Sequence, residues 1–455
     1  MFFKDLNIER DIGANCLYAK IGPFNIVVDA GMSPKETGVN SLPKFSEIPD
    51  FSLDFVIVTH CHLDHIGSLP IIMRDHPQSR LLLSPQSRQI VPIMLENSYL
   101  VMKRQRKELG IKEYPLYETH EIDRLNEHYF EMPHGIKRTF RKDNDAIDIT
   151  FFEAGHVAGA SGVLLEYKHR KIFFSGDVLF RKQKILAGGN WPNEKIDTLV
   201  METTRGATER TEKKNVNQEI EKLINTVQMT IKRGGSVLIP TFAFGRTQEI
   251  LTILHDAIKS KKLDKKIPIA CSGLGLTIVE AFDDISKKYP SLNFRKSILR
   301  DLGVQSLNRM KYLKPGQQPE KPTIFVVSSG MMIENTPSYN IAAALLGNHD
   351  NTICFVGYCD EDTPGGQLLN SPSKSTFTFN ALNYETQIRA SIERFDLSGH
   401  ADREELLQHA LNLDPRAIVL THGNDESREW FFNEFIYNAP NIQITDPEVL
   451  TEYWI

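Results

Sequence analysis

The sequence predicts an α/β protein with two domains, one of them a parallel α/β domain inserted into the other. Three observations predict this class: the chain length, the polar residues that follow short apolar runs, and alternating helix and strand patterns in the middle third. A single hydrophobic core usually stops growing near ~250–300 residues. Because the chain has 455 residues, we expect two domains.

The composition is typical of a globular protein. Hydrophobic residues make up 41% and charged residues 24% of the chain, so we expect all of it to fold. The net charge of −5 argues against a broad basic surface that coats nucleic acid. Any contact with a polyanion must therefore be local.

Neither a membrane span nor an export signal is expected. No apolar run reaches the ~18 residues that a transmembrane helix needs, and charges begin at Lys4 and Asp5, too early for a secretory signal. The five cysteines, an odd number without zinc-finger spacing, predict neither a disulfide framework nor a thiolate metal site. We therefore expect a soluble cytoplasmic protein.

Six short apolar runs, rich in β-branched residues, have the pattern of buried strands. They span residues 24–28, 55–58, 149–152, 172–174, 198–201 and 418–420. Each run is followed at once by polar residues of the kinds that bind metals or carry protons. These include Asp29, His60, His156, Asp177, Glu202 and His422. Loops at strand ends are where a rigid sheet presents reactive groups, so these side chains are the first candidates for a site.

The middle third alternates helical and strand patterns. Residues 211–233 are predicted to form a polar helix that ends at Gly234, and Thr247 is expected to cap a second amphipathic helix. The predicted strands span residues 236–240, 267–271, 323–327 and 352–356. Such βα alternation predicts a parallel sheet with helices on both faces.

Polar residues at strand ends resume only near Phe395, so the α/β segment is predicted to be an insertion. The expected division is residues 1–205 and 390–455 for the first domain and residues 206–389 for the inserted one.

The strongest local signal follows the run at 55–58. His60, His62, Asp64 and His65 place four ligand-type side chains within six positions. Imidazole and carboxylate groups suit zinc, and two zinc ions ~3.5–4 Å apart would need about this many ligands plus a bridging group. The pattern predicts a binuclear site, since ordinary surface histidines would explain one of these residues but not four together.

The His-x-His-x-Asp-His motif, followed by single His, Asp and His residues at later strand ends, resembles the metallo-β-lactamase superfamily over nearly the whole chain. The resemblance implies an αββα sandwich, with Asp29 steadying the ligand loop. It also implies two zinc ions, with Asp177 as the bridging carboxylate. The remaining metal ligands that it implies are His60, His62 and His156 for one ion and Asp64, His65 and His422 for the other. Histidine at position 62, where an iron-binding branch of the fold carries glutamate, favours zinc over iron.

The inserted segment resembles the β-CASP domain of the nucleic-acid-processing members. Residues 202–206, 395–402 and 419–423 match the family's motifs A, B and C. Residues 240–249, 328–332 and 356–365 also resemble strand-end loops of that domain. Histidine rather than an apolar residue at position 422 implies RNA over DNA as substrate. The chain departs from the family at Arg205, where motif A commonly has tyrosine, and at residues 333–338, which lack the usual glycines; both departures could alter how substrate is held.

The resemblance implies phosphodiester hydrolysis, with Asp64, His400 and Glu202 as the catalytic residues. His400 would be the general acid for the leaving oxygen, and Glu202 would orient it. Two structural alternatives stand beside these roles: Glu202 as a carboxylate that caps a turn, and His400 as a histidine that only supports the ligands.

Three further residues are candidates for binding substrate phosphates: Arg246, Ser329 and Ser398. Arg246 could equally brace the two domains through a salt bridge.

The sequence thus predicts a zinc-dependent ribonuclease acting on single-stranded RNA, endonucleolytic, 5′-exonucleolytic or both. The inserted domain is expected to close over a cleft too narrow for a duplex. Relatives in the family often dimerise, so a homodimer is expected. The alternatives are a DNA nuclease of the same family, a small-molecule ester or thioester hydrolase on the same zinc core, and a non-catalytic scaffold of a processing complex.

Overall fold

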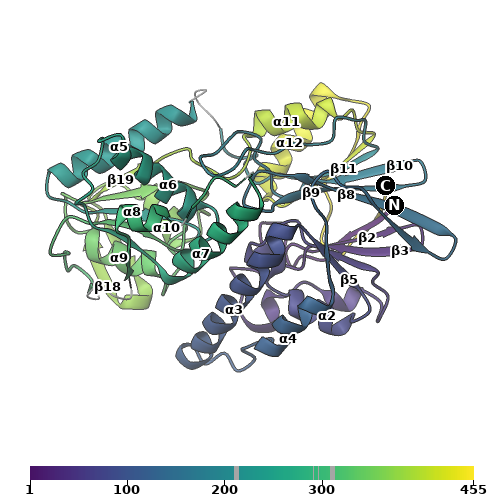
Figure 1. Ribbon diagram of the computed structural model, residues 1–455, viewed down its shortest axis with the longest axis horizontal. Helices are drawn as coiled ribbons and strands as arrows, with labels where there is room; N and C mark the ends of the chain where they lie inside the picture. Colours follow the sequence, from purple (N-terminus) through teal and green to yellow (C-terminus); the bar gives the residue numbers. More distant parts are fainter. Residues whose placement is uncertain (210–214, 291, 296, 308–312) are drawn as a thin grey trace. The chain divides into compact units, whose positions relative to one another are not determined.

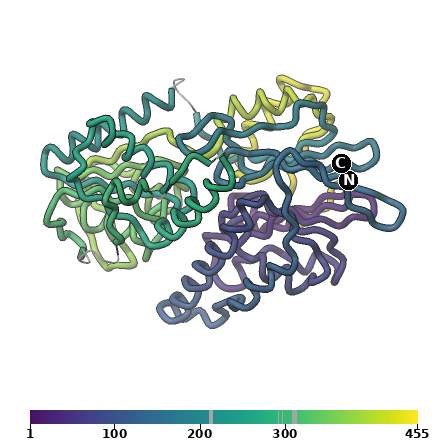
Figure 2. The backbone as a smooth tube through the Cα atoms, in the orientation of Figure 1, coloured from purple at the N-terminus to yellow at the C-terminus, as the bar shows by residue number. Residues whose placement is uncertain are grey.

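The computed structural model describes residues 1–209, 215–290, 292–295, 297–307 and 313–455. The chain divides into two compact units. Unit 1 comprises Met1–Lys182, Gly188–Thr211 and His400–Ile455, and unit 2 comprises Gln183–Ala187 and Glu212–Gly399. The two ends of the chain lie side by side in unit 1, where the Met1 amino group donates to the Ile455 carbonyl oxygen (Figure 2).

One sheet of unit 1 joins antiparallel strands at one side to parallel strands at the other. Its strand order is β22 (Glu452–Trp454), β1 (Phe2–Asp5), β2 (Leu17–Ile21), β3 (Phe24–Val28), β4 (Phe55–Ile57), β5 (Arg80–Leu83) and β6 (Tyr129–Glu131). The parallel side matters for the site, because β3 and β4 end at the same edge of the sheet.

The second sheet of unit 1 has the same mixed character, with β10 pairing parallel to β11 and antiparallel to β9. Its order is β21 (Gln443–Thr445), β20 (Ala417–Thr421), β11 (Thr198–Glu202), β10 (Arg170–Phe174), β9 (Ser161–Tyr167), β8 (Asp145–Glu153) and β7 (Arg138–Lys142). Apolar side chains of both sheets pack into one core, with Ile26 and Ile57 from the first sheet and Phe151, Val163 and Val419 from the second.

Helices cover the outer faces of both sheets (Figure 1). The first sheet is covered by α2 (Leu69–Asp75), α3 (Pro85–Glu108) and α4 (Thr119–Arg124), and the second by α11 (Arg403–Asn412) and α12 (Asp425–Asn438). The short helices α1 (Leu63–Ile66), η1 (Gly38–Ser41), η2 (Phe45–Glu47) and η3 (Leu125–Glu127) lie in the connections. Leu406 of α11 and Phe431 of α12 are buried with residues of the second sheet, which completes the predicted αββα layering.

Unit 2 contains a sheet whose strands all pair in parallel. The order is β14 (Gln305–Ser306), β13 (Ile269–Cys271), β15 (Ile324–Val327), β12 (Val237–Pro240), β16 (Thr352–Phe355) and β19 (Ser391–Arg394). Its helices are α5 (Val216–Lys232), α6 (Arg246–Lys259), α7 (Gly273–Lys288), α8 (Ser297–Leu302), α9 (Pro337–Leu345) and α10 (Pro364–Asn370). A hairpin of β17 (Thr376–Phe379) and β18 (Tyr384–Gln387), joined by η5 (Asn380–Leu382), precedes β19. The parallel α/β architecture predicted for this segment is confirmed.

The predicted cap of the second helix in unit 2 was wrong. Helix α6 begins at Arg246, and its N-cap is Gly245, whose φ of 91° suits glycine. The backbone N–H of Gly245 donates to Gln248 Oε1 at 2.7 Å. Thr247 is already inside the helix, and its hydroxyl donates to the Phe242 carbonyl oxygen at 2.9 Å. The first four residues of the helix predicted over 211–233 lie outside the described residues.

No helix in the described part of the chain combines the length and apolar character that crossing a bilayer would require.

Gly235 marks a close backbone approach between the end of α5 and the start of β16. A Cβ atom at this position would lie 1.8 Å from the Asp350 carbonyl oxygen, which is too close for any side chain. We predict that Gly235→Ala lowers the unfolding free energy of unit 2 by about 1–3 kcal/mol or more, measured as a lower Tm in calorimetry.

Gly357→Ala is the matched control, because nothing lies within 4 Å of the added Cβ and its φ is not positive. It should change the unfolding free energy by less than ~0.5 kcal/mol. Equal Tm values for the two variants would contradict this account.

Candidate metal centre

The ends of four strands in unit 1 bring the predicted ligands to one place. His60, His62, Asp64 and His65 follow β4, His156 follows β8, Asp177 follows β10, and His422 follows β20. His422 has a φ of 51°, a left-handed conformation that turns the chain sharply as β20 ends.

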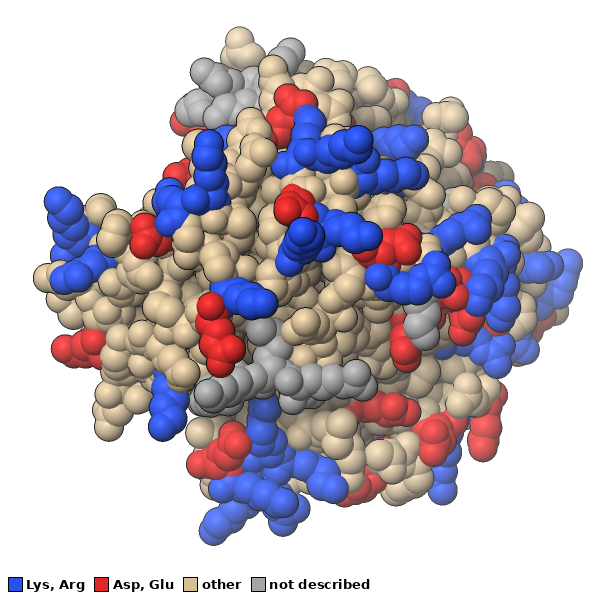
Figure 3. All heavy atoms as spheres, turned by 60° about the vertical axis from the view of Figure 1, so that its left-hand side comes forward, with Lys and Arg blue, Asp and Glu red and all other residues tan. Residues whose placement is uncertain are grey.

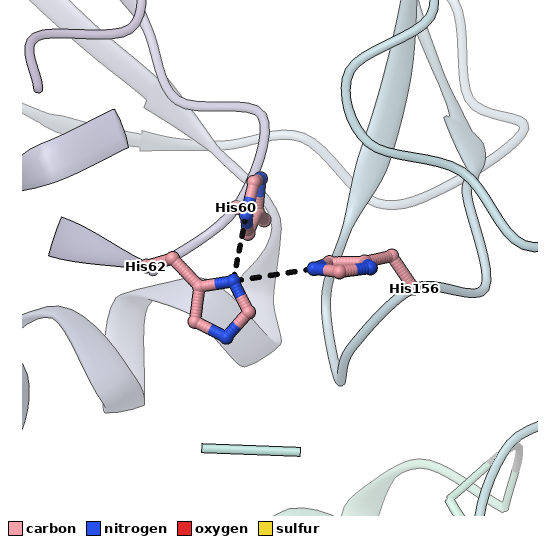
Figure 4. Close-up of side chains that lie close together, drawn as sticks. All are labelled: His60, His62 and His156. Carbon is pink, nitrogen blue, oxygen red and sulfur yellow. Dashed lines mark hydrogen bonds between the residues drawn. The ribbon is translucent and has the colours of Figure 1, made fainter. Parts of the chain in front are cut away.

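One cluster consists of His60, His62 and His156. The Nδ1 atom of His62 lies 3.1 Å from His60 Nε2 and 3.2 Å from His156 Nε2, as Figure 4 shows. One imidazole nitrogen makes only one hydrogen bond in the plane of its ring. Hydrogen bonds between the rings therefore do not account for three nitrogens that converge on a common point.

A second cluster consists of Asp64, His65 and His422. The two histidine Nε2 atoms are 3.2 Å apart. Asp64 Oδ2 lies 3.6 Å from His65 Nε2 and 3.4 Å from His422 Nε2. These three side chains thus also turn their donor atoms toward one point.

The carboxylate of Asp177 lies between the two clusters. Its Oδ2 atom is 3.5 Å from His60 Nε2, 3.5 Å from His65 Nε2 and 3.8 Å from His156 Nε2. Its Oδ1 atom is 3.2 Å from His422 Nδ1. Within the described residues, this buried Oδ1 has no hydrogen-bond partner. The Oδ2 atom of Asp177 therefore faces ring nitrogens of both clusters.

The donor atoms fit a divalent metal. Ligand atoms held ~2.0–2.1 Å from a tetrahedral zinc ion stand about 3.3 Å apart. The separations within the two clusters, from 3.1 to 3.6 Å, bracket that value. Among the described residues, the buried Oδ1 atom of Asp177 also has no hydrogen-bond partner, which leaves it available to a cation.

The electrostatics of the site also suit a cation. Burial alone would raise the pKa of the Asp64 carboxyl, but the charges of His65 and His422 outweigh it and place the pKa at about 2. The pKa of Asp177 is likewise lowered, because three histidines outweigh its burial. Burial, reinforced by His65, holds the pKa of His60 well below its usual value. The carboxylates are thus ionised and His60 keeps a free lone pair.

Asp29 fixes the orientation of His65, one of the candidate ligands. Its carboxylate accepts hydrogen bonds from the Thr59 backbone N–H at 2.8 Å and the Thr59 hydroxyl at 2.7 Å, and it lies 2.7 Å from His65 Nδ1. A proton held on Nδ1 leaves Nε2 of His65 free to bind a metal. Asp29 thus occupies the supporting position that the resemblance implies.

Further side chains that the sequence patterns do not predict support the candidate ligands. Asn15 Nδ2 lies 3.2 Å from Asp29 Oδ2, and the Thr204 hydroxyl lies 3.0 Å from His422 Nδ1. The buried Arg428 donates from Nε to the Gly423 carbonyl oxygen at 2.7 Å. Thr204 follows a predicted strand and could have been found by its position. Asn15 follows no predicted strand, and Arg428 lies in a polar stretch, residues 424–429, that does not distinguish it from its neighbours.

His400 lies beside the donor set. Its Nδ1 atom is 3.0 Å from Glu202 Oε2, and its ring centroid is 4.5 Å from that of His156. Glu202 is 3% exposed and also accepts from the Val178 backbone N–H at 2.7 Å. Burial opposes a charge on His400, but Glu202 outweighs it and raises the pKa of that imidazole.

Arg246, Ser329 and Ser398 belong to unit 2, whereas the donor atoms belong to unit 1. The Arg246 guanidinium is buried and donates to the Leu397 carbonyl oxygen at 2.8 Å and to Gln183 Oε1. The Ser329 hydroxyl accepts from the Ile333 N–H at 2.9 Å. A phosphate would have to compete with these bonds, so binding by these residues stays a prediction.

Three family models match successive parts of the chain. The Metallo-beta-lactamase superfamily matches residues 10–210, the Beta-Casp domain residues 247–368, and the Zn-dependent metallo-hydrolase RNA specificity domain residues 385–436. The chain thus contains a metallo-β-lactamase domain and a Beta-Casp domain. The metallo-β-lactamase match implies a divalent metal, typically zinc.

Curated relatives of this β-CASP protein include transcription termination factor FttA of Pyrococcus abyssi, 27% identical over 92% of this chain and 66% of FttA. Endoribonuclease YSH1 of Saccharomyces cerevisiae is 26% identical over 98% of this chain and 57% of YSH1. Integrator complex subunit 11 of Danio rerio is 27% identical over 93% of this chain and 69% of that subunit. The chain thus spans only 57–69% of the length of these relatives.

A solved structure supports the fold. The crystal structure of a protein of unknown function from Enterococcus faecalis V583 superposes with a TM-score of 0.56 over 99% of both chains, at 12% sequence identity.

Removing the central carboxylate should weaken metal binding. We predict that Asp177→Asn lowers zinc affinity by at least ~10-fold, since one neutral amide would replace a charge shared by both clusters. Metal analysis of dialysed protein measures the bound zinc. The control is Asp284→Asn, at a carboxylate that is 68% exposed on α7. Equal zinc content in the two variants would exclude Asp177 as a ligand.

Proposed function

We propose that this chain is a zinc-dependent ribonuclease that hydrolyses phosphodiester bonds of single-stranded RNA in RNA processing or decay. One observation carries the proposal: two clusters of three donor atoms share Asp177, and the His400–Glu202 pair lies beside them. Such a centre suits hydrolysis of a phosphodiester, whose transition state gathers negative charge next to a leaving oxygen that needs a proton.

Two zinc ions per chain are proposed because the ligands fall into two sets. His60, His62 and His156 would hold one ion. Asp64, His65 and His422 would hold the other. Two ions at one carboxylate are typical of sites that clamp both the attacking and the leaving oxygen of a phosphate.

The zinc ions, when bound, supply water of lowered pKa and positive charge for the phosphate oxygens. Asp64, whose side chain is 22% exposed, is at once a ligand and the carboxylate that orients the attacking water. His400 donates a proton from Nε2 to the leaving sugar oxygen. Glu202 holds the Nδ1 proton of His400 and keeps the imidazole charged. General acid catalysis of this kind contributes ~10²–10⁴-fold in rate.

RNA is proposed as substrate on three grounds. The RNA specificity family model covers residues 385–436. This range includes His400, strand β20 and the His422 that follows it. YSH1 is named an endoribonuclease. Histidine stands at position 422, where the resemblance implies RNA rather than DNA. Basic and acidic side chains are interspersed over the face drawn in Figure 3, which fits a local rather than a broad contact with the polyanion.

Three expectations concern the partners and the cellular location of this chain. The relative from Danio rerio is by name a subunit of a complex. We therefore propose that this chain also acts as a subunit of a larger complex. The homodimer stays a prediction from the resemblance, and the cytoplasmic location stays a prediction from the cysteines, all of which are buried thiols.

The decisive assay uses zinc-loaded protein with single-stranded RNA and DNA of matched sequence, each labelled at the 5′ end. We predict cleavage of the RNA, and a loss of ~10²–10⁴-fold with His400→Ala while bound zinc is unchanged. The product ladder separates internal cuts from trimming at the 5′ end.

Other outcomes would favour the alternatives. Preferential cleavage of DNA would replace RNA as the substrate, and hydrolysis of a chromogenic ester without cleavage of either strand would favour an ester hydrolase. Protein that binds no zinc would favour a non-catalytic scaffold. Full activity of His400→Ala would refute the proton-donor role.

A further inference from the structure

Arg205 lies at the position where this chain departs from the β-CASP pattern, and its side chain is only 9% exposed. Its Nη1 atom forms an ion pair with Asp402 Oδ1 at 2.6 Å and also donates to the His400 carbonyl oxygen at 3.4 Å. Asp402 is itself largely buried, with a side chain 12% exposed. The Arg205 guanidinium therefore binds both the backbone of His400 and the side chain of Asp402.

Backbone hydrogen bonds also hold the segment that carries His400. It lies between β19 and α11 and forms no strand or helix. The Ala401 backbone N–H donates to the Val178 carbonyl oxygen at 2.7 Å, and the Val178 N–H donates to Glu202 Oε1 at 2.7 Å. Through Val178, these bonds link the backbone next to His400 to the Glu202 carboxylate. Arg205 binds the carbonyl oxygen of His400 itself.

The Asp402 carboxylate pairs with Arg205 and does not cap helix α11. Asp402 is the N-cap residue of α11, with an extended backbone that suits capping, and aspartate is among the preferred N-cap residues. Yet its side chain makes no capping hydrogen bond. The carboxylate pairs with Arg205 instead, so the ion pair replaces a contact that would stabilise the helix.

We propose that Arg205, anchored by Asp402, is a positioning residue that holds the His400 imidazole against Glu202. The inference rests on the proposed function, in which His400 protonates the leaving oxygen. Arg205 acts through the backbone of His400 and not on substrate, since its buried guanidinium is committed to Asp402 and to that carbonyl oxygen. A tyrosine at this position could not form the same ion pair.

Leaving groups of different basicity test the proposal. Single-turnover rates are measured on RNA with one cleavable linkage, either normal or with sulfur in place of the leaving oxygen. A thiolate leaves without a proton, so cleavage of the sulfur linkage does not need a general acid. Arg205→Met should slow the normal linkage by ~10–100-fold and the sulfur linkage by less than ~3-fold, with zinc content unchanged.

Three companion variants sharpen the result. Arg403→Met removes a neighbouring arginine that donates to the Gly206 carbonyl oxygen, and it should keep both rates. Asp402→Asn should repeat the selective loss, and adding it to Arg205→Met should slow the normal linkage by less than ~2-fold more, since both changes break one interaction. His400→Ala should show the same selectivity with a larger loss.

A crystal structure of Arg205→Met gives a readout that does not depend on activity. The 3.0 Å contact between His400 Nδ1 and Glu202 should be lost or displaced. An unchanged contact, or equal losses on both linkages, would overturn the positioning role. Wild-type protein that cleaves neither linkage would overturn the proposed function instead, and the crystal structure would still decide the role of Arg205.

Discussion

The Asp177 carboxylate is the group on which the centre depends. It is 3% exposed, and an ionised carboxylate at such a depth is costly unless positive charge lies beside it. Four histidines bring ring nitrogens within 3.8 Å of its oxygens, yet its Oδ1 atom has no hydrogen-bond partner among the described residues. Bound dications, one in each cluster, would supply positive charge next to this carboxylate. The need to compensate one buried carboxylate thus accounts for the arrangement of the candidate ligands around it.

Buried strands of unit 1 end close together, and hydrogen bonds hold the loops that follow them. The layers of unit 1 fix where β4, β8, β10 and β20 stop, while hydrogen bonds decide how each loop turns. Asp29 and Arg428 are both buried and bind backbone groups next to ligands, at Thr59 and at Gly423. Arg205 likewise binds a backbone group, the carbonyl oxygen of His400. In these three loops, the supporting side chain is charged and largely buried, and it forms a hydrogen bond with the backbone.

The sequence predicted what depends on contiguous patterns. The apolar runs became β3, β4, β8, β10, β11 and β20, and most ends moved by two residues or fewer, although β8 begins at Asp145, four residues before its predicted start. A buried strand needs only a short β-branched run. The candidate ligands were predictable because each follows such a run. The start of α6 was predicted wrongly, since the positive φ of Gly245 let the helix begin earlier. No local pattern predicts roles that depend on contacts between distant segments. Such roles include the support given by Asn15 and Arg428 and the place of Gln183–Ala187 in unit 2.

Anomalous diffraction from zinc-loaded crystals, recorded on both sides of the zinc absorption edge, tests the central claim most directly. The account predicts two peaks ~3.5–4 Å apart, one enclosed by His60, His62 and His156 and the other by Asp64, His65 and His422, with Asp177 between them. A single peak, or none, at these side chains in zinc-loaded crystals would contradict a binuclear centre.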